Sequence, residues 1–332
     1  TGSDGLRIMS SVMSSTLLAA LPPETTTGFG VPIVECTVFG DGFSWGSVRT
    51  ADVHISSEAA AGIPIQVIGD PDFTNIPAAC SNTGASEDTV ATFGANGILG
   101  VGPFVQDCPD CTDSTQLGVY YSCPTGGGVC SPTQVLSKQI VSNPVASFTT
   151  DNNGVIVELP SVPDAGSPTV TGALVFGIGT QGNNGLGSAT VLTTDSMGDI
   201  TVTYKGVAYP GGFLDSGSNL DYLVDGSITT CVLGSNSDPN SATFFCPSSE
   251  LRLSAQNEGV NGVESSVSFN IANANTQFNN NPSFTAFNNV AAPNTFDTQG
   301  FDFGLPFFYG HNVFTAIQGM NTSGGLGPYF AY

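Results

Sequence analysis

The residues best suited to chemistry lie in a short turn, residues 215–218 (Asp-Ser-Gly-Ser), that follows two apolar residues. The small residues after Asp215 let the backbone turn sharply, and their hydroxyl and amide groups can hold the carboxylate in place. Residues 1–3 (Thr-Gly-Ser) repeat the end of this turn without its aspartate. Two carboxylates that share one proton have pKa values driven apart, so one can act as general base on a water and the other as general acid. The sequence shows one such acid, Asp215.

The pattern around Asp215 has a counterpart in the first half of the chain. Each turn is followed, about 90 to 100 residues later, by an apolar segment that contains a glycine, at residues 97–100 and at residues 301–305. A repeat of this length predicts two homologous lobes rather than a solenoid of short units. We place the lobes at residues 1–175 and 176–332.

Short runs of β-branched and aromatic residues between Gly, Asn, Asp and Pro predict a mostly β fold. Residues 200–204 and 267–271 alternate with the two-residue period of half-buried strands. Helices are expected only at residues 133–142 and 224–233. No stretch approaches the ~20 apolar residues that a membrane helix needs, so no membrane insertion is expected.

The charge balance excludes one class of partner. The chain has 27 acidic and five basic residues and a net charge of −22, so no basic patch for nucleic acid or an anionic membrane can be assembled. The acidic surplus fits two explanations: acidic surroundings that neutralise many carboxylates, or solubility of an exported protein. The chain starts without Met or a leader, which we interpret as a mature or truncated fragment.

Eight cysteines form an even set, which predicts disulfides made in an oxidising compartment. Cys231 and Cys246 lie far from the other six and are expected to pair within the second half. The four cysteines between residues 108 and 130 could also form a four-thiolate zinc site, but they lie in a Gly, Pro and Asp-rich excursion without a zinc-ribbon pattern. Disulfides are therefore favoured, and neither a metal nor an organic cofactor is expected.

Together these segments resemble the pepsin-like aspartic proteinase superfamily. Residues 213–219 are similar to its second active-site turn, residues 1–3 to the tail of the first, residues 37–48 to the flap hairpin, and residues 96–102 to the strand beneath the first aspartate. The resemblance implies a bilobal β monomer that hydrolyses an extended peptide or protein substrate, using Asp215 and an aspartate lost just before Thr1. It also implies that upstream strands of the first lobe are missing, so the fragment itself would be inactive.

The resemblance assigns the supporting residues as well. Those that would orient the two carboxylates are Thr1, Gly2, Ser3, Ser216, Gly217 and Ser218. Those that would form the flap and the adjoining cleft are Phe39, Gly40, Asp41, Gly42 and Trp45. The two flap glycines are expected to make its tip mobile. Local packing of the hairpin is the favoured role of the tryptophan, ahead of substrate contact.

Three features depart from the superfamily pattern. Phe39 stands in place of the flap tyrosine and lacks its phenolic donor. Asp302 occupies an apolar position of the second apolar strand, where an unpaired charge costs several kcal/mol, so it is either satisfied locally or the alignment slips by one residue. No aspartate precedes Thr1, and we favour its loss from the fragment over its natural absence.

Residues 41–46, 151–154, 176–181 and 303–310 resemble, more narrowly, an uncharacterised bacterial family of predicted pepsin-like exported proteins with a domain of unknown function. This implies a bacterial protein that is secreted, periplasmic or at the cell surface. Two alternatives to proteolysis stay open. One is a binding protein or inhibitor that keeps the fold without catalysis. The other is a cell-surface interaction protein that uses the cysteine-rich excursion at residues 107–131.

Overall fold

The computed structural model describes residues 1–234 and 242–332, which form a mostly β protein, as predicted. The chain divides into two compact units. The N-terminal unit spans Ser3–Asn152, and the C-terminal unit combines Thr1–Gly2 with Asn153–Tyr332. The division lies upstream of the boundary expected after residue 175, because β10 (Ala173–Phe176) pairs with β9 (Gly154–Glu158) inside the C-terminal unit.

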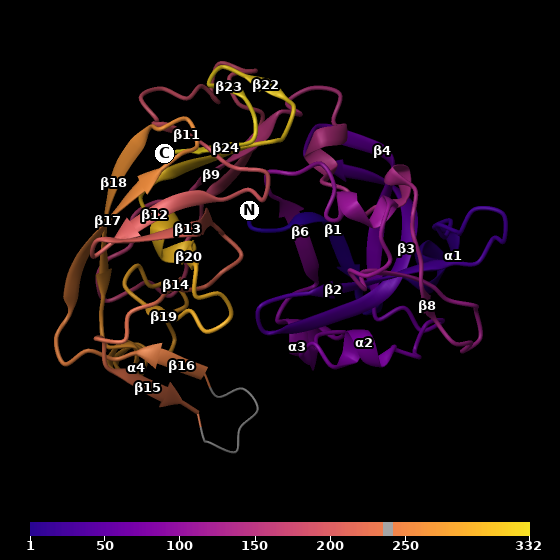
Figure 1. The fold of residues 1–332 in the computed structure, drawn as a ribbon, viewed down its shortest axis with the longest axis horizontal. Helices are drawn as coiled ribbons and strands as arrows, with labels where there is room; N and C mark the ends of the chain where they lie inside the picture. Colours follow the sequence, from indigo (N-terminus) through magenta and orange to yellow (C-terminus); the bar gives the residue numbers. More distant parts are fainter. Residues whose placement is uncertain (235–241) are drawn as a thin grey trace. The chain divides into compact units, whose positions relative to one another are not determined.

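The N-terminal unit is built on one large sheet, drawn in indigo to magenta in Figure 1. Its strand order, within the described residues, is β6-β1-β4-β3-β2-β7-β8, and β5 pairs with β3. The strands are β1 (Asp4–Met9), β2 (Ile33–Val38), β3 (Gly42–Ile55), β4 (Glu58–Ile68), β5 (Ala85–Ser86), β6 (Gly97–Val101), β7 (Tyr120–Ser122) and β8 (Ser131–Pro132).

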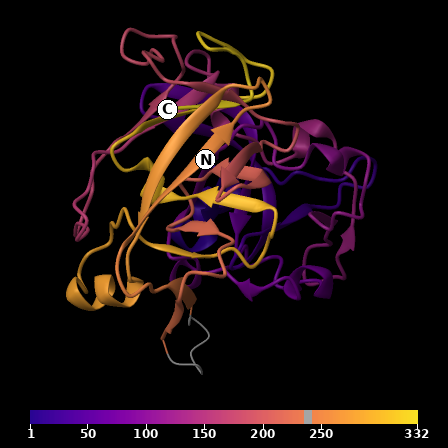
Figure 2. The same ribbon diagram turned by 60° about the vertical axis from the view of Figure 1, so that its left-hand side comes forward.

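The C-terminal unit contains two larger sheets and two hairpins among its described residues. The seven-stranded sheet runs β18-β17-β12-β13-β20-β14-β19, and the five-stranded sheet runs β10-β9-β21-β24-β11. The long strands β17 and β18 run antiparallel, side by side, and come forward in Figure 2. The strands not yet bounded are β11 (Val191–Thr193), β12 (Ile200–Tyr204), β13 (Val207–Leu214), β14 (Asp221–Leu223), β15 (Thr230–Leu233), β16 (Ala242–Phe245), β17 (Leu251–Glu258), β18 (Glu264–Ile271), β19 (Ala291–Pro293), β20 (Gly300–Phe303), β21 (Asn312–Ala316), β22 (Asn321–Thr322), β23 (Gly325–Leu326) and β24 (Tyr329–Ala331).

Apolar and polar residues alternate along the strands of the seven-stranded sheet, and the apolar side chains pack into one hydrophobic core. Both predicted strands are confirmed: residues 200–204 form β12, and residues 267–271 end β18, each with alternate side chains buried. Phe301 and Phe303 of β20 are fully buried, with ring centroids 4.6 Å apart, beside the buried Leu214 that ends β13. Burying one such side chain stabilises the fold by about 1.5–3 kcal/mol, so the centre of this sheet is a firm support.

Both predicted helices are wrong. Residues 133–142 contain only a short 3-10 turn, η3 (Ser137–Gln139), and the apolar residues with helical spacing pack as an irregular segment against the Cys108–Cys111 disulfide. Residues 224–233 include Gly226, and their β-branched end forms β15, which pairs with β16. The helical elements are α1 (Ser15–Ala20), α2 (Ala78–Ser81), α3 (Val90–Phe93), α4 (Ala274–Asn280), α5 (Leu305–Phe308), η1 (Ser10–Val12), η2 (Pro109–Thr112) and η4 (Pro144–Ser147). Across the described ranges, no helix is long and apolar enough to cross a membrane.

All eight cysteines are paired in disulfides, so the thiolates of a zinc site are not available. The predicted pair Cys231–Cys246 is confirmed and joins β15 to β16. The pairs in the N-terminal unit are Cys36–Cys80, Cys108–Cys111 and Cys123–Cys130.

Candidate functional site

Asp215 stands at the end of the central strand β13, on a turn that the core holds in place. Its backbone N–H donates to the carbonyl of Phe303 at 2.9 Å, and the N–H of Ser218 donates back to the Asp215 carbonyl at 3.2 Å. The N–H of Gly217 donates to Oδ1 of Asp215 at 2.7 Å, and the Ser218 hydroxyl lies 3.1 Å from Oδ2. The side chain is 19% exposed, so a water or a substrate can reach this carboxylate.

The first two residues of the chain belong to the same unit and bind this turn. The Thr1 hydroxyl donates to the Leu214 carbonyl and accepts from the Ser216 N–H, each at 3.0 Å. The Thr1 amino group in turn donates to Oγ of Ser216 at 3.0 Å. Three hydrogen bonds therefore join Thr1 to the Asp215 turn: Thr1 donates two of them and accepts the third.

Gly2 completes the contact with the carboxylate. Its N–H donates to Oδ1 of Asp215 at 2.8 Å, the same oxygen that Gly217 binds. A Cβ on Gly2 would lie 2.7 Å from Oδ2, so this position has no room for a side chain. Five of the six predicted supporting residues thus surround Asp215. The sixth, Ser3, belongs to the N-terminal unit, where its carbonyl accepts from the N–H of Gly102 at 2.9 Å.

These contacts set the charge state of Asp215. Burial on its own raises the pKa of the carboxyl, but the Thr1 amino group 3.5 Å away and the donors on Gly217, Gly2 and Ser218 favour the charged form more strongly. The net effect is a pKa below the usual range for aspartate. Asp215 is consequently an ionised carboxylate that can accept a proton from a bound water.

Asp302 lies directly behind the turn and was not predicted as a site residue. It is 6% exposed on β20, opposite Phe213 of β13 and Tyr222 of β14. Its Oδ2 is 2.5 Å from the Ser218 hydroxyl, whereas its Oδ1 has no hydrogen-bond partner among the described residues. Burial, and then the charge of Asp215, raises its pKa well above the usual range. The departure from an apolar pattern is real, and Ser218 supplies the local partner.

The strand register reveals a duplication within the chain. In the N-terminal unit, β1 pairs antiparallel with β6, with Arg7 opposite Ile98, and parallel with β4. In the C-terminal unit, β14 pairs antiparallel with β20, with Tyr222 opposite Asp302, and parallel with β19. Asp302 therefore corresponds to Ile98, and the alignment has not slipped by one residue.

Gly100 in the N-terminal unit and Gly304 in the C-terminal unit occupy corresponding positions in the strand register. A Cβ on Gly100 would lie 2.7 Å from the Gly5 carbonyl, and a Cβ on Gly304 would lie 2.8 Å from the Ser218 carbonyl. In each copy a strand passes too close beneath the turn for any side chain. Counting along this register aligns Thr1 with Ser216, so the position before Thr1 is the counterpart of Asp215.

The residues predicted as the flap form a hairpin between β2 and β3 in the N-terminal unit. Val38 lies opposite Phe43, and the Phe39 N–H donates to the Gly42 carbonyl at 2.8 Å. The Phe39 ring packs edge-on against Phe93, with centroids 5.7 Å apart. A Cβ on Gly40 would meet open space, so this residue is not needed for steric reasons.

Trp45 and Asp41 have partners inside the N-terminal unit. Trp45 is 2% exposed, donates its indole N–H to the Phe73 carbonyl at 2.7 Å, and packs edge-on against Tyr121. It therefore packs the hairpin locally. Asp41 bonds to the buried carboxyl of Glu87, whose pKa rises to about 7 through burial and then through the Asp41 charge.

The family model for "Protein of unknown function (DUF3443)" matches residues 1–332. The chain belongs to the DUF3443 family. A solved structure with some likeness is the crystal structure of an aspartic proteinase from Irpex lacteus, with 16% sequence identity, a TM-score of 0.49, and coverage of 99% of this chain and 87% of that one. No curated protein matches the chain.

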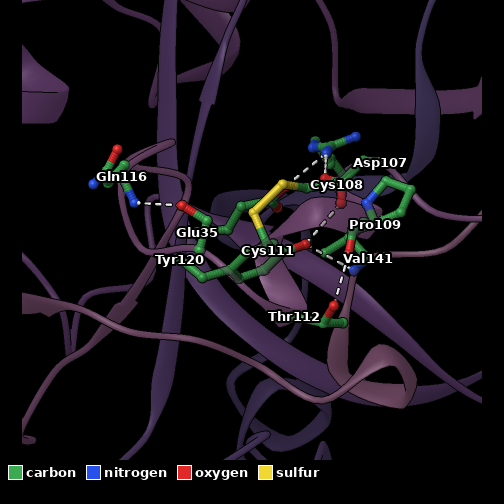
Figure 3. The surroundings of a disulfide bond; sticks show 11 residues. Glu35, Asp107, Cys108, Pro109, Cys111, Thr112, Gln116, Tyr120 and Val141 are labelled. Atoms are coloured by element: carbon green, nitrogen blue, oxygen red, sulfur yellow. Dashed lines mark hydrogen bonds and ion pairs between the residues drawn. A yellow bond between two sulfur atoms is a disulfide. The ribbon is translucent and has the colours of Figure 1, made fainter. Parts of the chain in front are cut away.

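The N-terminal unit of this DUF3443 chain also holds a buried ionic cluster that the sequence did not reveal. Arg7 is 1% exposed and binds Glu35 at 2.7 Å and also Asp107. Figure 3 shows Asp107 beside the Cys108–Cys111 disulfide, where it accepts from the Tyr120 hydroxyl at 2.8 Å. The partners are far apart in sequence, so no local motif marks them. In the part of the chain that is described, no three His, Cys, Asp or Glu residues are placed to hold a metal ion.

Proposed function

We propose that the intact protein is a pepsin-like aspartic endopeptidase, with Asp215 as one acid and an aspartate directly before Thr1 as the other. The observation that carries this proposal is the set of reciprocal hydrogen bonds between residues 1–2 and residues 214–217. The Thr1 nitrogen lies 3.5 Å from Oδ1 of Asp215. An aspartate bonded to that nitrogen begins within reach of Asp215, as proton sharing requires.

The reaction follows from the charge states. Asp215, whose ionised form accepts from the Gly217 and Gly2 N–H groups and the Ser218 hydroxyl, takes a proton from a water that attacks the peptide carbonyl. The partner acid donates its proton to the carbonyl oxygen, which gives a tetrahedral diol. Asp215 then gives its proton to the nitrogen of the leaving amine, the partner acid takes one back from a diol hydroxyl as the C–N bond breaks, and the dyad returns to its starting state. Thr1, Ser216 and the adjoining glycines keep both acids oriented.

Cellular location is part of the proposal. Four disulfides are stable in an oxidising compartment, which supports export of the protein. The proposed location is the periplasm, the cell surface or the medium of a bacterium. An acidic working medium fits the net charge of −22, because protonation of carboxylates lowers self-repulsion.

The test is digestion of casein at acidic pH by a longer natural chain that includes residues upstream of Thr1. Activity that Asp215→Asn abolishes, and that a pepstatin-type inhibitor blocks, is the expected result. Asp225→Asn is the matched control, because this carboxyl of the same unit binds Lys205 at 2.7 Å rather than the turn. Digestion that persists in Asp215→Asn, or a natural sequence with another residue before Thr1, would overturn the proposal.

One observation favours a second candidate function. Phe39 has no phenolic hydroxyl to join a hydrogen-bond network in the cleft. A protein that binds a peptide without cleaving it, as a binding protein or inhibitor, would keep the fold and lose this donor. Tight binding of pepstatin with no digestion at any acidic pH would support that function over hydrolysis.

A further inference from the structure

One serine hydroxyl lies between two carboxyl groups at the base of the turn. Oγ of Ser218 is 3.1 Å from Oδ2 of Asp215 and 2.5 Å from Oδ2 of Asp302. A serine hydroxyl carries a single proton, so it can donate to only one of these oxygens. The other short contact is a hydrogen bond only if the second carboxyl is itself protonated and donates to Oγ.

Environment decides which carboxyl carries the extra proton. Asp215 is partly exposed and receives donors from Gly217 and Gly2. Asp302 is 6% exposed, and no group in the described residues bonds to its Oδ1. A charge at Asp302 would be buried and nearly unsolvated, which costs several kcal/mol, whereas a neutral acid there costs far less.

The ionisable groups that face Asp302 favour the same assignment. Asp215, at the end of β13, and Asp221, on β14, each present a carboxyl toward it, and the Thr1 amino group is the cation on this side. That amino group lies 3.5 Å from Asp215 and binds Ser216 at 3.0 Å. Asp221 accepts from the Gly304 N–H at 3.0 Å, and burial raises its pKa well above the usual range, so it adds little negative charge. The charge of Asp215 is the main electrostatic influence that disfavours an ionised Asp302.

We propose that Asp302 is a protonated carboxylic acid that donates its proton to Ser218, which in turn donates its own proton to Asp215. Asp302 is then a positioning residue: it fixes the Ser218 hydroxyl as a donor to the ionised carboxylate. No covalent step is involved, and the proton count is one on Asp302, one on Ser218 and none on Asp215. As a regulator of peptide hydrolysis, this role rests on the proposed function.

The N-terminal unit has no buried acid at the corresponding position. Its register equivalent of Asp302 is Ile98, which cannot donate to a serine. The two acids of the proposed dyad are therefore not equivalent, since only Asp215 is held by a buried acid through a hydroxyl. Ionisation of Asp302 at high pH would remove the donor to Ser218 and add a negative charge behind Asp215, so the support of Asp215 depends on a neutral Asp302.

The protonation state can be measured on the 332-residue chain without any activity. Aspartate labelled with an isotope at its carboxyl carbon gives one NMR signal per residue, and Asp302→Asn identifies the Asp302 signal by its loss. The expected signal is that of a neutral acid at pH values where ordinary aspartates, and Asp215, are ionised. A signal that titrates near the ordinary aspartate pKa of about 3.9 would overturn the proposal.

The same variant supplies a second, independent readout. The amide that Asp302→Asn introduces imitates a neutral acid and can still donate to Ser218, so the pKa of Asp215 should change by less than about 0.5. Removal of an ionised neighbour would instead lower that pKa by about 1 or more, which would contradict the assignment. Ser218→Ala keeps both carboxyls and should raise the pKa of Asp215, because it removes a donor to the charged form; an unchanged pKa would refute the chain of donors.

Activity separates this inference from the proposed function. In the longer active chain, Asp302→Asn should keep most of kcat at acidic pH, because the amide can still donate to Ser218. Asp302→Leu, which fills the site without a donor, should lower kcat across the whole profile. A neutral Asp302 in a chain without proteolysis would refute the proposed function alone, and an active chain with an ionised Asp302 would refute this inference alone.

Discussion

Replacement of Thr1 by valine tests whether the opening residues hold the Asp215 turn together. Valine has the shape of threonine without its hydroxyl, so Thr1→Val removes the bonds to the Leu214 carbonyl and from the Ser216 N–H, each 3.0 Å long. Thr1 is 6% exposed, so water replaces these partners only in part. A buried polar group left unpaired costs about 1–3 kcal/mol, and two such groups, with partial access of water, predict a loss of about 2–4 kcal/mol.

Thr315→Val is the matched control in the same unit. Thr315 is fully buried on β21, and its hydroxyl has no hydrogen-bond partner among the described residues. The same chemical change there removes an unsatisfied polar group at nearly constant volume, so it should be neutral or stabilising. Thr1→Ser keeps the hydroxyl and should retain most of the stability that Thr1→Val loses.

The assay must separate the two units. Trp45 is the only tryptophan and lies in the N-terminal unit, so its fluorescence reports urea unfolding of that unit alone. Hydrogen exchange of peptides from residues 207–218 and 300–304 reports on the turn and the strand beneath it. We expect Thr1→Val to speed exchange in both peptides and to leave the fluorescence transition unchanged. Equal effects of Thr1→Val and Thr315→Val would refute the reasoning.

Two further predictions concern the close approach beneath the turn and the acidic hairpin. Gly304→Ala should unfold the C-terminal unit at a much lower urea concentration, because its Cβ would lie 2.8 Å from the Ser218 carbonyl, whereas a Cβ on Gly226 meets open space and Gly226→Ala should change the circular-dichroism midpoint little. Glu87, with a pKa raised to about 7, binds more protons folded than unfolded between about pH 4.3 and pH 7, so the N-terminal unit should lose stability as pH rises through that window. The urea concentration at the midpoint of the Trp45 fluorescence transition should decrease as the pH is raised from about 4.5 to about 7.5. An equal decrease in Glu87→Gln would show that Glu87 is not the cause.

The sequence predicts those features whose determinants lie close together along the chain. Alternation alone identifies β12 and the end of β18, because each strand carries its own buried face. The chemistry of small residues after Asp215 predicts the turn, and the repeat of that turn at residues 1–3 predicts its partner. The bonds between Thr1 and Ser216 are the structural counterpart of that repeat.

Features that depend on distant partners could not be predicted in this way. Residues 133–142 have helical spacing, but their apolar side chains are buried by a disulfide-bearing loop rather than by a helix face. Arg7 meets Glu35 and Asp107 only after β1 and β2 are placed in one sheet. A single basic residue on a strand carries no signal for such burial.

Asp302 shows how a violation of a local pattern can be informative. The same register position in the N-terminal unit is Ile98, which needs neither a partner nor a proton, so the strand pairing itself does not require a carboxyl there. An acid at this position carries a desolvation cost that one hydrogen bond to Ser218 offsets only in part, since its Oδ1 finds no partner among the described residues. What the acid adds, and isoleucine cannot, is a donor aimed at the hydroxyl that binds Asp215. The aspartate in place of isoleucine therefore acts on Asp215. It orients the Ser218 hydroxyl toward Asp215, and this orientation is lost at the pH where Asp302 ionises.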